Sequence, residues 1–93
     1  MFNHIVLFRL QDEGDTEEAL RRLQALAEQV PVIRSLEAGR NLVPAERAYD
    51  VGLVVKLDSL DDLPAYANHP DHQALLAWIK PRVTGVAAVD FNA

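Results

Sequence analysis

The sequence contains no cysteine, which excludes disulfides, iron–sulfur clusters, thiolate zinc sites and a cysteine nucleophile. No apolar run approaches the roughly 18–20 residues that span a bilayer, and residues 1–10 lack the basic start of a secretory signal. The four glycines are isolated from one another, so the chain has no glycine-rich loop for phosphate groups. We therefore expect a cytoplasmic protein without a membrane segment.

Basic residues are also scarce. Lys and Arg number 9 against 14 Asp and Glu, so the formal net charge is −5 at pH 7. Nucleic-acid binding needs clustered Lys and Arg that neutralise phosphates, so a nucleic-acid partner is not expected. The 93 residues are 49% hydrophobic and 25% charged, which is typical of a globular chain, and we interpret residues 1–93 as one domain. So short a chain buries only about 60–65% of its unfolded surface, and self-association would add to that burial.

The spacing of apolar residues predicts the element order β-α-β-β-α-β. Strands are expected over 1–10, 32–42 (with a bulge near Gly39), 49–58 and 83–91, and helices over 15–30 and 59–80. Asp15 and Glu18 have the spacing of a capping box, Ser59 is a candidate cap, and His69-Pro70 interrupts the second helix. This order is typical of the α+β ferredoxin-like fold, in which two helices cover one face of an antiparallel four-stranded sheet.

The uncovered face of that sheet is predicted to be apolar. Ile5 and Leu7 lie opposite His4 on the first strand, and Gly52 and Val54 lie on the corresponding face of the third. An exposed apolar sheet face is an interaction surface. We therefore expect a homodimer whose sheets face each other and close into a dimeric α/β barrel. The alternative is a monomer with a few exposed aliphatic side chains.

Three side chains are the candidate catalytic residues. His72 lies at the start of a helix, which lowers its pKa and favours the neutral, proton-accepting form, so we predict a general base. Tyr66 is expected to orient that imidazole or to donate a hydrogen bond to a developing enolate oxygen. His4 is expected to point into the same space as a polar anchor. The alternative for all three is a structural role with satisfied hydrogen bonds.

The candidate ligand-binding residues are apolar residues of the strands together with two residues of the second helix. His69 also has a simpler role as a helix cap before Pro70, and an aromatic residue at a helical position is more often part of the core. The three histidines lack the spacing of a recognised zinc motif, so neither a metal nor a cofactor is predicted. The predicted set is Val6, Phe8, Val51, Leu53, His69 and Trp78.

Several segments carry a family resemblance over essentially the whole chain. They are His4-Ile5-Val6-Leu7-Phe8-Arg9-Leu10, Tyr49-Asp50-Val51, Leu57-Asp58-Ser59-Leu60-Asp61-Asp62-Leu63, Tyr66 with His69-Pro70-Asp71-His72, and Val89-Asp90-Phe91. In these segments the sequence resembles the stress-responsive dimeric alpha/beta barrel (Dabb) family. The resemblance implies a ferredoxin-like subunit that dimerises through its sheet, with a cleft between sheet and helices, and it implies no single activity.

One member of that family, the olivetolic acid cyclase of plants, closes a polyketide chain by aldol condensation. The resemblance implies that its acid–base His and supporting Tyr correspond to His72 and Tyr66, and its first-strand His to His4. Another of its cleft histidines falls at Val51, so the same substrate is not expected.

Three functions stay open at this point. The first is a homodimeric Dabb protein that binds a small apolar or aromatic molecule in its cleft, with or without acid–base chemistry by His72 and Tyr66. The second is a non-catalytic stress-response or structural protein. The third is a cofactor-free monooxygenase or a polyketide cyclase-like enzyme on a related barrel, since one fold hosts many functions.

Overall fold

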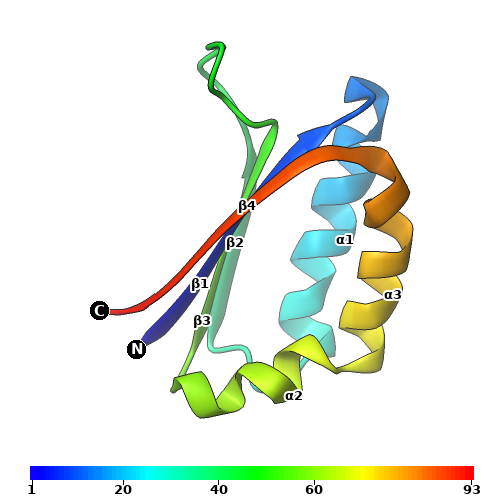
Figure 1. Cartoon of the computed structure of the whole chain (residues 1–93). Coiled ribbons are helices and arrows are strands. Elements are labelled where there is room, and N and C mark those ends of the chain that lie inside the picture. Colours follow the sequence, from blue (N-terminus) through cyan, green and yellow to red (C-terminus); the bar gives the residue numbers. More distant parts are fainter.

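A computed structural model describes residues 1–93 and contains one sheet and three α-helices (Figure 1). The elements are β1 (Phe2–Leu10), α1 (Thr16–Gln29), β2 (Ser35–Arg40), β3 (Val51–Leu57), α2 (Leu63–Ala67), α3 (Pro70–Ile79) and β4 (Val83–Asn92). All strand pairs are antiparallel, and the strand order is β2-β3-β1-β4. The predicted ferredoxin-like α+β order, with its second helix broken, is confirmed. None of the helices has the length and apolar character that crossing a bilayer demands.

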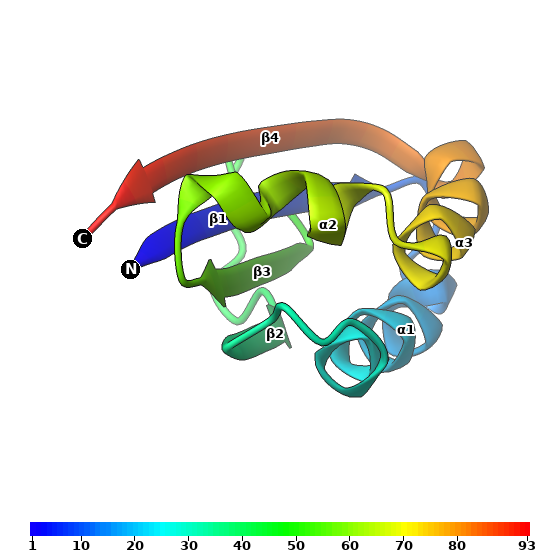
Figure 2. The ribbon, with the colours of Figure 1, turned by 90° about the horizontal axis from the view of Figure 1, so that it is seen from below.

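The three helices lie on one side of the sheet and leave its other side bare. Helices α1 and α3 run along the sheet, and α2 crosses the end of the molecule between β3 and α3 (Figures 1 and 2). Alternate residues of each strand point to this covered side, as the period of two in a strand requires. On β3 these are Val51, Leu53, Val55 and Leu57, all buried, and they pack with Leu23 and Leu26 of α1 and with residues of β1.

The start of α1 differs from the prediction. Asp15 makes no capping hydrogen bond, and Glu18 instead accepts hydrogen bonds from Arg21 and Arg22. The capping box at Asp15 and Glu18 is therefore wrong. A 3₁₀ turn over Glu13–Asp15 precedes the helix and gives Asp15 a helical backbone, whereas a capping residue has an extended one. The capping carboxylate belongs to Asp12, which accepts from the backbone N–H of Gly14 at 2.8 Å.

The second strand is shorter than predicted and has no bulge. Gly39 pairs with Gly52 in a continuous register from Ser35 to Arg40. The bulge near Gly39 is therefore wrong, and the shift in register lies instead between Arg9 and Leu10, where β1 pairs with β4. Residues 32 and 33, expected in this strand, pack against the core from the loop that precedes it.

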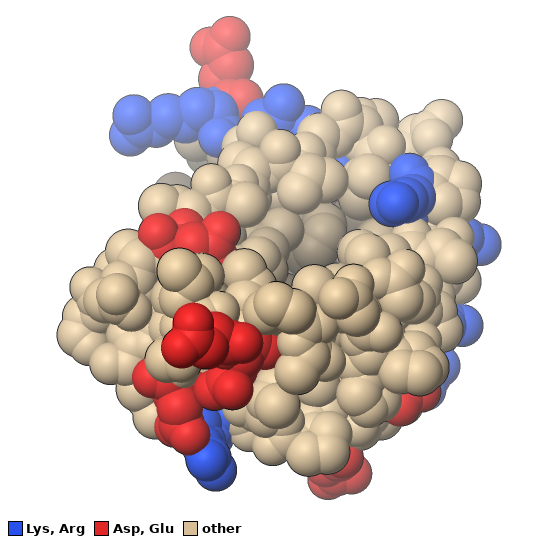
Figure 3. Space-filling model, turned by 60° about the horizontal axis from the view of Figure 1, so that its bottom comes forward, with Lys and Arg blue, Asp and Glu red and all other residues tan.

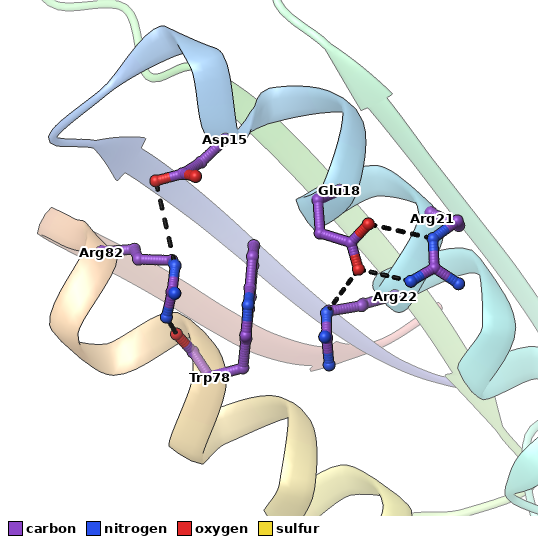
Figure 4. A network of polar contacts seen from close by, with 6 residues as sticks. All are labelled: Asp15, Glu18, Arg21, Arg22, Trp78 and Arg82. Atoms are coloured by element: carbon purple, nitrogen blue, oxygen red, sulfur yellow. Dashed lines mark hydrogen bonds and ion pairs between the residues drawn. The ribbon is translucent and has the colours of Figure 1, made fainter.

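Trp78 joins α3 to α1 through a stack of two guanidinium groups. The Cζ atom of Arg22 lies 4.7 Å, and that of Arg82 4.5 Å, from the centroid of the Trp78 ring system (Figure 4). Glu18 orients the first guanidinium by accepting from Arg22 Nε at 2.7 Å. Arg82 Nη1 donates to the Trp78 carbonyl at 2.6 Å, and Asp15 lies 4.0 Å from Arg82 Nε. The indole is therefore part of a contact between helices.

The centre of the bare side of the sheet is apolar, as predicted. Leu7, Val89 and Phe91 are 37%, 53% and 43% exposed on the isolated chain. The strand register places Ile5 between Val54 and Val89 on this same face. Because no helix covers these residues, the face is available to another apolar surface.

Replacing Trp78 by Leu is expected to lower the free energy of unfolding by about 1–3 kcal/mol. The change removes two cation–π contacts of about 0.5–1 kcal/mol each and part of the buried ring surface. Urea unfolding measures it. Arg22→Ala should lower the free energy of unfolding by less in the Trp78→Leu variant than in the unmodified protein, because the contact it removes is already absent there. An equal cost in both backgrounds would show that the stack does not stabilise the pair of helices.

Candidate functional site

Three aromatic side chains from three elements meet between the sheet and the helices. His4 comes from β1, Tyr66 from α2 and His72 from α3. The Tyr66 ring lies between the two imidazoles, with centroid distances of 5.6 Å to His4 and 4.4 Å to His72. The structure thus brings together the three residues predicted as catalytic, although 62 positions separate His4 from Tyr66 (66 − 4).

The break between α2 and α3 determines the protonation of His72. In a continuous helix the N–H of Asp71 would donate to the carbonyl of Ala67, but here it donates to the side chain of His69. His72 Nδ1 lies 2.9 Å from that carbonyl oxygen, which also accepts from Gln73 Nε2 at 2.7 Å. A carbonyl only accepts, so Nδ1 carries the proton and Nε2 of the neutral ring is unprotonated.

Burial lowers the pKa of His72, and the charges of His4 and His69 act in the same direction, against the hydrogen bond to Ala67, which raises it. His72 is therefore neutral at pH 7. A neutral imidazole with a free Nε2 is the form that accepts a proton from a bound molecule.

Tyr66 adds a hydrogen-bond donor to the site. Its residue surface is 2% exposed, and burial raises the pKa of its hydroxyl to about 12, so the hydroxyl keeps its proton. The hydroxyl makes no hydrogen bond to a protein atom. Every fully buried polar side-chain atom of the protein has a hydrogen-bond partner, so the oxygen of this hydroxyl is not fully buried. The ring is therefore in the core while the hydroxyl reaches accessible space, where it is free to bind a ligand oxygen.

Asp90 holds His4 in place and was not predicted as part of the site. The two residues face each other across the β1–β4 ladder, and His4 Nδ1 lies 2.5 Å from Asp90 Oδ1. The carboxylate accepts the Nδ1 proton, so in neutral His4 the free nitrogen is again Nε2. Only the pairing of β1 with β4 brings these residues together, since they are 86 positions apart in the chain. Aligning the two predicted strands in antiparallel register is the signal that would have found Asp90.

The predicted apolar ligand residues lie deeper than expected. All four are buried in the core beneath the helices: Val6, Phe8, Val51 and Leu53. The exposed apolar surface on the covered side belongs instead to β4. Val86, which is 53% exposed, pairs with Phe8, and Ala88, also exposed, pairs with Val6.

The two remaining predicted residues have structural contacts. His69 Nδ1 accepts from the N–H of Asp71 at 3.1 Å and caps α3, with Pro70 as the first helical residue. The ring of Trp78 stacks between Arg22 and Arg82, and no aromatic or hydrogen-bond contact joins it to His72. The structure does not bring these two residues together with the three catalytic candidates as one constellation.

The surface at the end of the molecule that carries α2 is hollowed. Figure 3, seen towards the end that carries α2, shows a hollow among uncharged residues, with acidic residues beside it and no Lys or Arg atoms in it. No three His, Asp or Glu side chains are arranged as metal ligands. The largest recess, about 810 Å³, is elsewhere, between the bare sheet face and residues 41–49, and contains none of the three candidates. The candidate site is the group of His4, Tyr66 and His72, because the lining of that recess contains no histidine to serve as a base.

Long-range ¹H–¹⁵N spectra at pH 7 should show His72 as the neutral Nδ1–H tautomer, titrating below the ordinary histidine pKa of about 6.5. Because the folded-state pKa is the lower one, the unfolded chain takes up this proton first as the pH falls through 6.5, and stability decreases. The urea-unfolded protein supplies the reference titration. A folded-state pKa at or above that reference would contradict the buried, neutral His72.

Known proteins match this chain both in sequence and in fold, over nearly all of its residues. The sequence profile of the family described as Stress responsive A/B Barrel Domain (Dabb) matches residues 2–93. An uncharacterized protein of Streptomyces coelicolor is 32% identical over 93 residues, which are 95% of this chain and 96% of that protein.

Two crystal structures of dimeric ferredoxin-like proteins of unknown function are also similar. The one from Thermobifida fusca is 35% identical with a TM-score of 0.87, and the match covers 99% of this chain and 90% of the Thermobifida chain. The one from Bacteroides fragilis is 31% identical with a TM-score of 0.83, and the match covers 99% of this chain and 95% of the Bacteroides chain. The chain therefore belongs to the stress-responsive A/B barrel (Dabb) family.

Proposed function

We propose that this Dabb protein is a homodimer that binds a small apolar or aromatic molecule between its sheet and helices, and that His72 takes a proton from it. The observation that carries the proposal is the free Nε2 of a neutral His72 beside a Tyr66 hydroxyl without a protein partner. A donor and an acceptor on adjacent rings, in a mostly apolar environment, are the parts that acid–base chemistry needs.

The reaction that fits these groups is proton removal next to a carbonyl. The Nε2 lone pair of His72 takes the proton from carbon, and the electron pair of the C–H bond moves to the carbonyl oxygen, which becomes an enolate. The Tyr66 hydroxyl donates a hydrogen bond to that oxygen, which stabilises the charge as it develops. His4, held through Nδ1 by Asp90, binds a second polar group of the ligand. Side chains alone supply these steps.

The homodimer is supported by the dimeric relatives and by the bare sheet face. Both similar crystal structures are of dimeric proteins. In this chain Leu7, Val89 and Phe91 expose apolar surface that the helices do not cover. Pairing two such faces removes this surface from water, and each copy then keeps its own site on the opposite side of its sheet.

A non-catalytic protein is the second candidate, and one observation favours it. Both imidazoles already have a hydrogen-bond partner through Nδ1, His4 with Asp90 and His72 with Ala67. Such contacts are sufficient to hold buried rings in a stable fold. Only activity or ligand binding distinguishes the two candidates.

We expect the protein to accelerate deuterium exchange at the carbons beside the carbonyl of 4-phenylbutan-2-one in D₂O, measured by ¹H NMR. His72→Gln should lower the protein-dependent rate by about 100-fold or more because it removes the base. Tyr66→Phe should lower it by at least about tenfold because it removes the donor to the enolate. Glu28→Gln, at an exposed position on α1 away from the site, is the control and should retain the rate.

Two results would contradict this assignment. Exchange equal to that in buffer, together with shifts of protein resonances on adding the ketone, would leave a binding protein without acid–base activity. Neither exchange nor binding, with His72→Gln indistinguishable from the unmodified protein, would favour the non-catalytic candidate.

Replacing Leu7 by Asp is expected to convert the dimer to a monomer. The change places a charge on the bare sheet face, and burying it against a second apolar face is costly. Sedimentation equilibrium should give twice 10.3 kDa for the unmodified protein and 10.3 kDa for the variant. Val86→Asp is the matched control, since Val86 is also exposed but lies on the covered side of the sheet. A monomeric unmodified protein would overturn the dimer.

A further inference from the structure

No Lys or Arg side chain contacts the residues of the candidate site. Six of the nine basic residues are engaged elsewhere: Arg9 on Tyr49, Arg21 and Arg22 at Glu18, Arg34 at Asp58, Arg40 at Glu17, and Arg82 on Trp78. Arg47 is in the loop before β3, Lys56 is on the bare sheet face, and Lys80 is an exposed residue after α3. None of the nine pairs with His4, Tyr66, His72 or Asp90.

The site contains one carboxylate, that of Asp90. Asp90 donates nothing and accepts only from His4, and its side chain is 40% exposed. Its second carboxylate oxygen has no protein partner, so it remains available to repel a ligand anion. The chain as a whole carries −5, which adds to this field rather than opposing it.

The hydrogen-bonding pattern also disfavours an anion. Nδ1 of each histidine faces a protein oxygen, so in their neutral forms His4 and His72 each present an unprotonated Nε2, and the site then has two acceptors and a single donor, the Tyr66 hydroxyl. A carboxylate only accepts, and burying one without a cation is costly. An uncharged molecule with hydroxyl or carbonyl groups satisfies all three protein groups.

The covered side of β4 sets the direction of such a ligand. Along this strand Val86 and Ala88 are exposed and apolar, and Asp90 follows at the next inward position. Apolar surface thus precedes the polar groups in the direction from residue 86 to residue 90. A ligand on this strand would have its apolar body over Val86 and Ala88 and its polar head at His4.

We propose that the cleft takes uncharged ligands, with an apolar body over Val86 and Ala88 and an oxygen-bearing head at His4, and that the Asp90 carboxylate excludes carboxylate-bearing molecules of similar shape. This inference rests on the proposed function, since it concerns the same site. It adds a class of ligand and makes Asp90 a specificity-determining residue.

Alkylation of the histidines tests the charge selection without a known ligand. Iodoacetamide is neutral and iodoacetate is an anion of nearly the same shape, and both react at unprotonated imidazole nitrogen. The chain has no cysteine to compete for them. Rates at His4 and His72 are measured at pH 7.5 by peptide mass mapping, and each iodoacetamide-to-iodoacetate ratio is divided by the ratio for N-acetylhistidine.

The normalised ratio at the cleft histidines should be about tenfold above one, since like charges repel over short distances in a partly buried site. Asp90→Asn keeps an oxygen that accepts from His4 but removes the charge, and should bring the ratio to within about twofold of one. Glu28→Gln is the matched control, because it removes one negative charge from an exposed position on α1 and should leave the ratio unchanged.

The outcomes separate this inference from the proposed function. Reactive histidines with a ratio near one would overturn the charge selection and leave His72 as an accessible base. An equal effect of Asp90→Asn and Glu28→Gln would assign the selection to net charge, and so overturn the role of Asp90. No reaction of His72 with either reagent would overturn the base itself, and the proposed function with it.

Discussion

The interruption of the second helix at Pro70 is the constraint on which the site depends. In an unbroken helix the carbonyl of Ala67 would accept from the N–H of Asp71. Here that N–H donates to the side chain of His69, and the Ala67 carbonyl accepts from His72 Nδ1 instead. The break at Pro70 thus redirects the N–H of Asp71 and leaves the Ala67 carbonyl to two side chains, those of His72 and Gln73, which gives His72 a defined tautomer.

The same interruption places the ring of Tyr66 against that of His72. With α2 and α3 continuous, side chains six positions apart would project from different faces of one helix. The bend brings their rings to 4.4 Å, and Tyr66 also contacts His4 on the sheet. A small backbone feature therefore creates a contact among three elements, and the desolvation that lowers the pKa of His72 and raises that of Tyr66 follows from it.

The two sides of the sheet differ in what covers them. The covered side buries β1 and β3 under the helices, but the helices leave part of the edge strand β4 open, so Val86 stays exposed there. The opposite side is apolar and uncovered along β1 and β4. A second copy on that side would stabilise a short chain without closing the site, because the site opens on the other side of the sheet.

Much of the fold was predictable from local patterns. Alternation identified the buried row of β3, the order of the elements identified the ferredoxin-like plan, and Ser59 and His69 cap the turns that their sequence positions indicate. The errors are at ends of elements. Asp15 is not a cap because a 3₁₀ turn precedes it, and the irregular register is at Arg9 and Leu10 rather than at Gly39.

The sequence by itself determined which residues are able to take or give a proton, because the chemistry of His4, Tyr66 and His72 belongs to their side chains. Only the tertiary structure decided that Asp90 faces His4, that Trp78 joins two helices, and that Val86 rather than Val51 is exposed. The physical reason is that these relations depend on pairing and packing between elements distant along the chain, which no local pattern encodes.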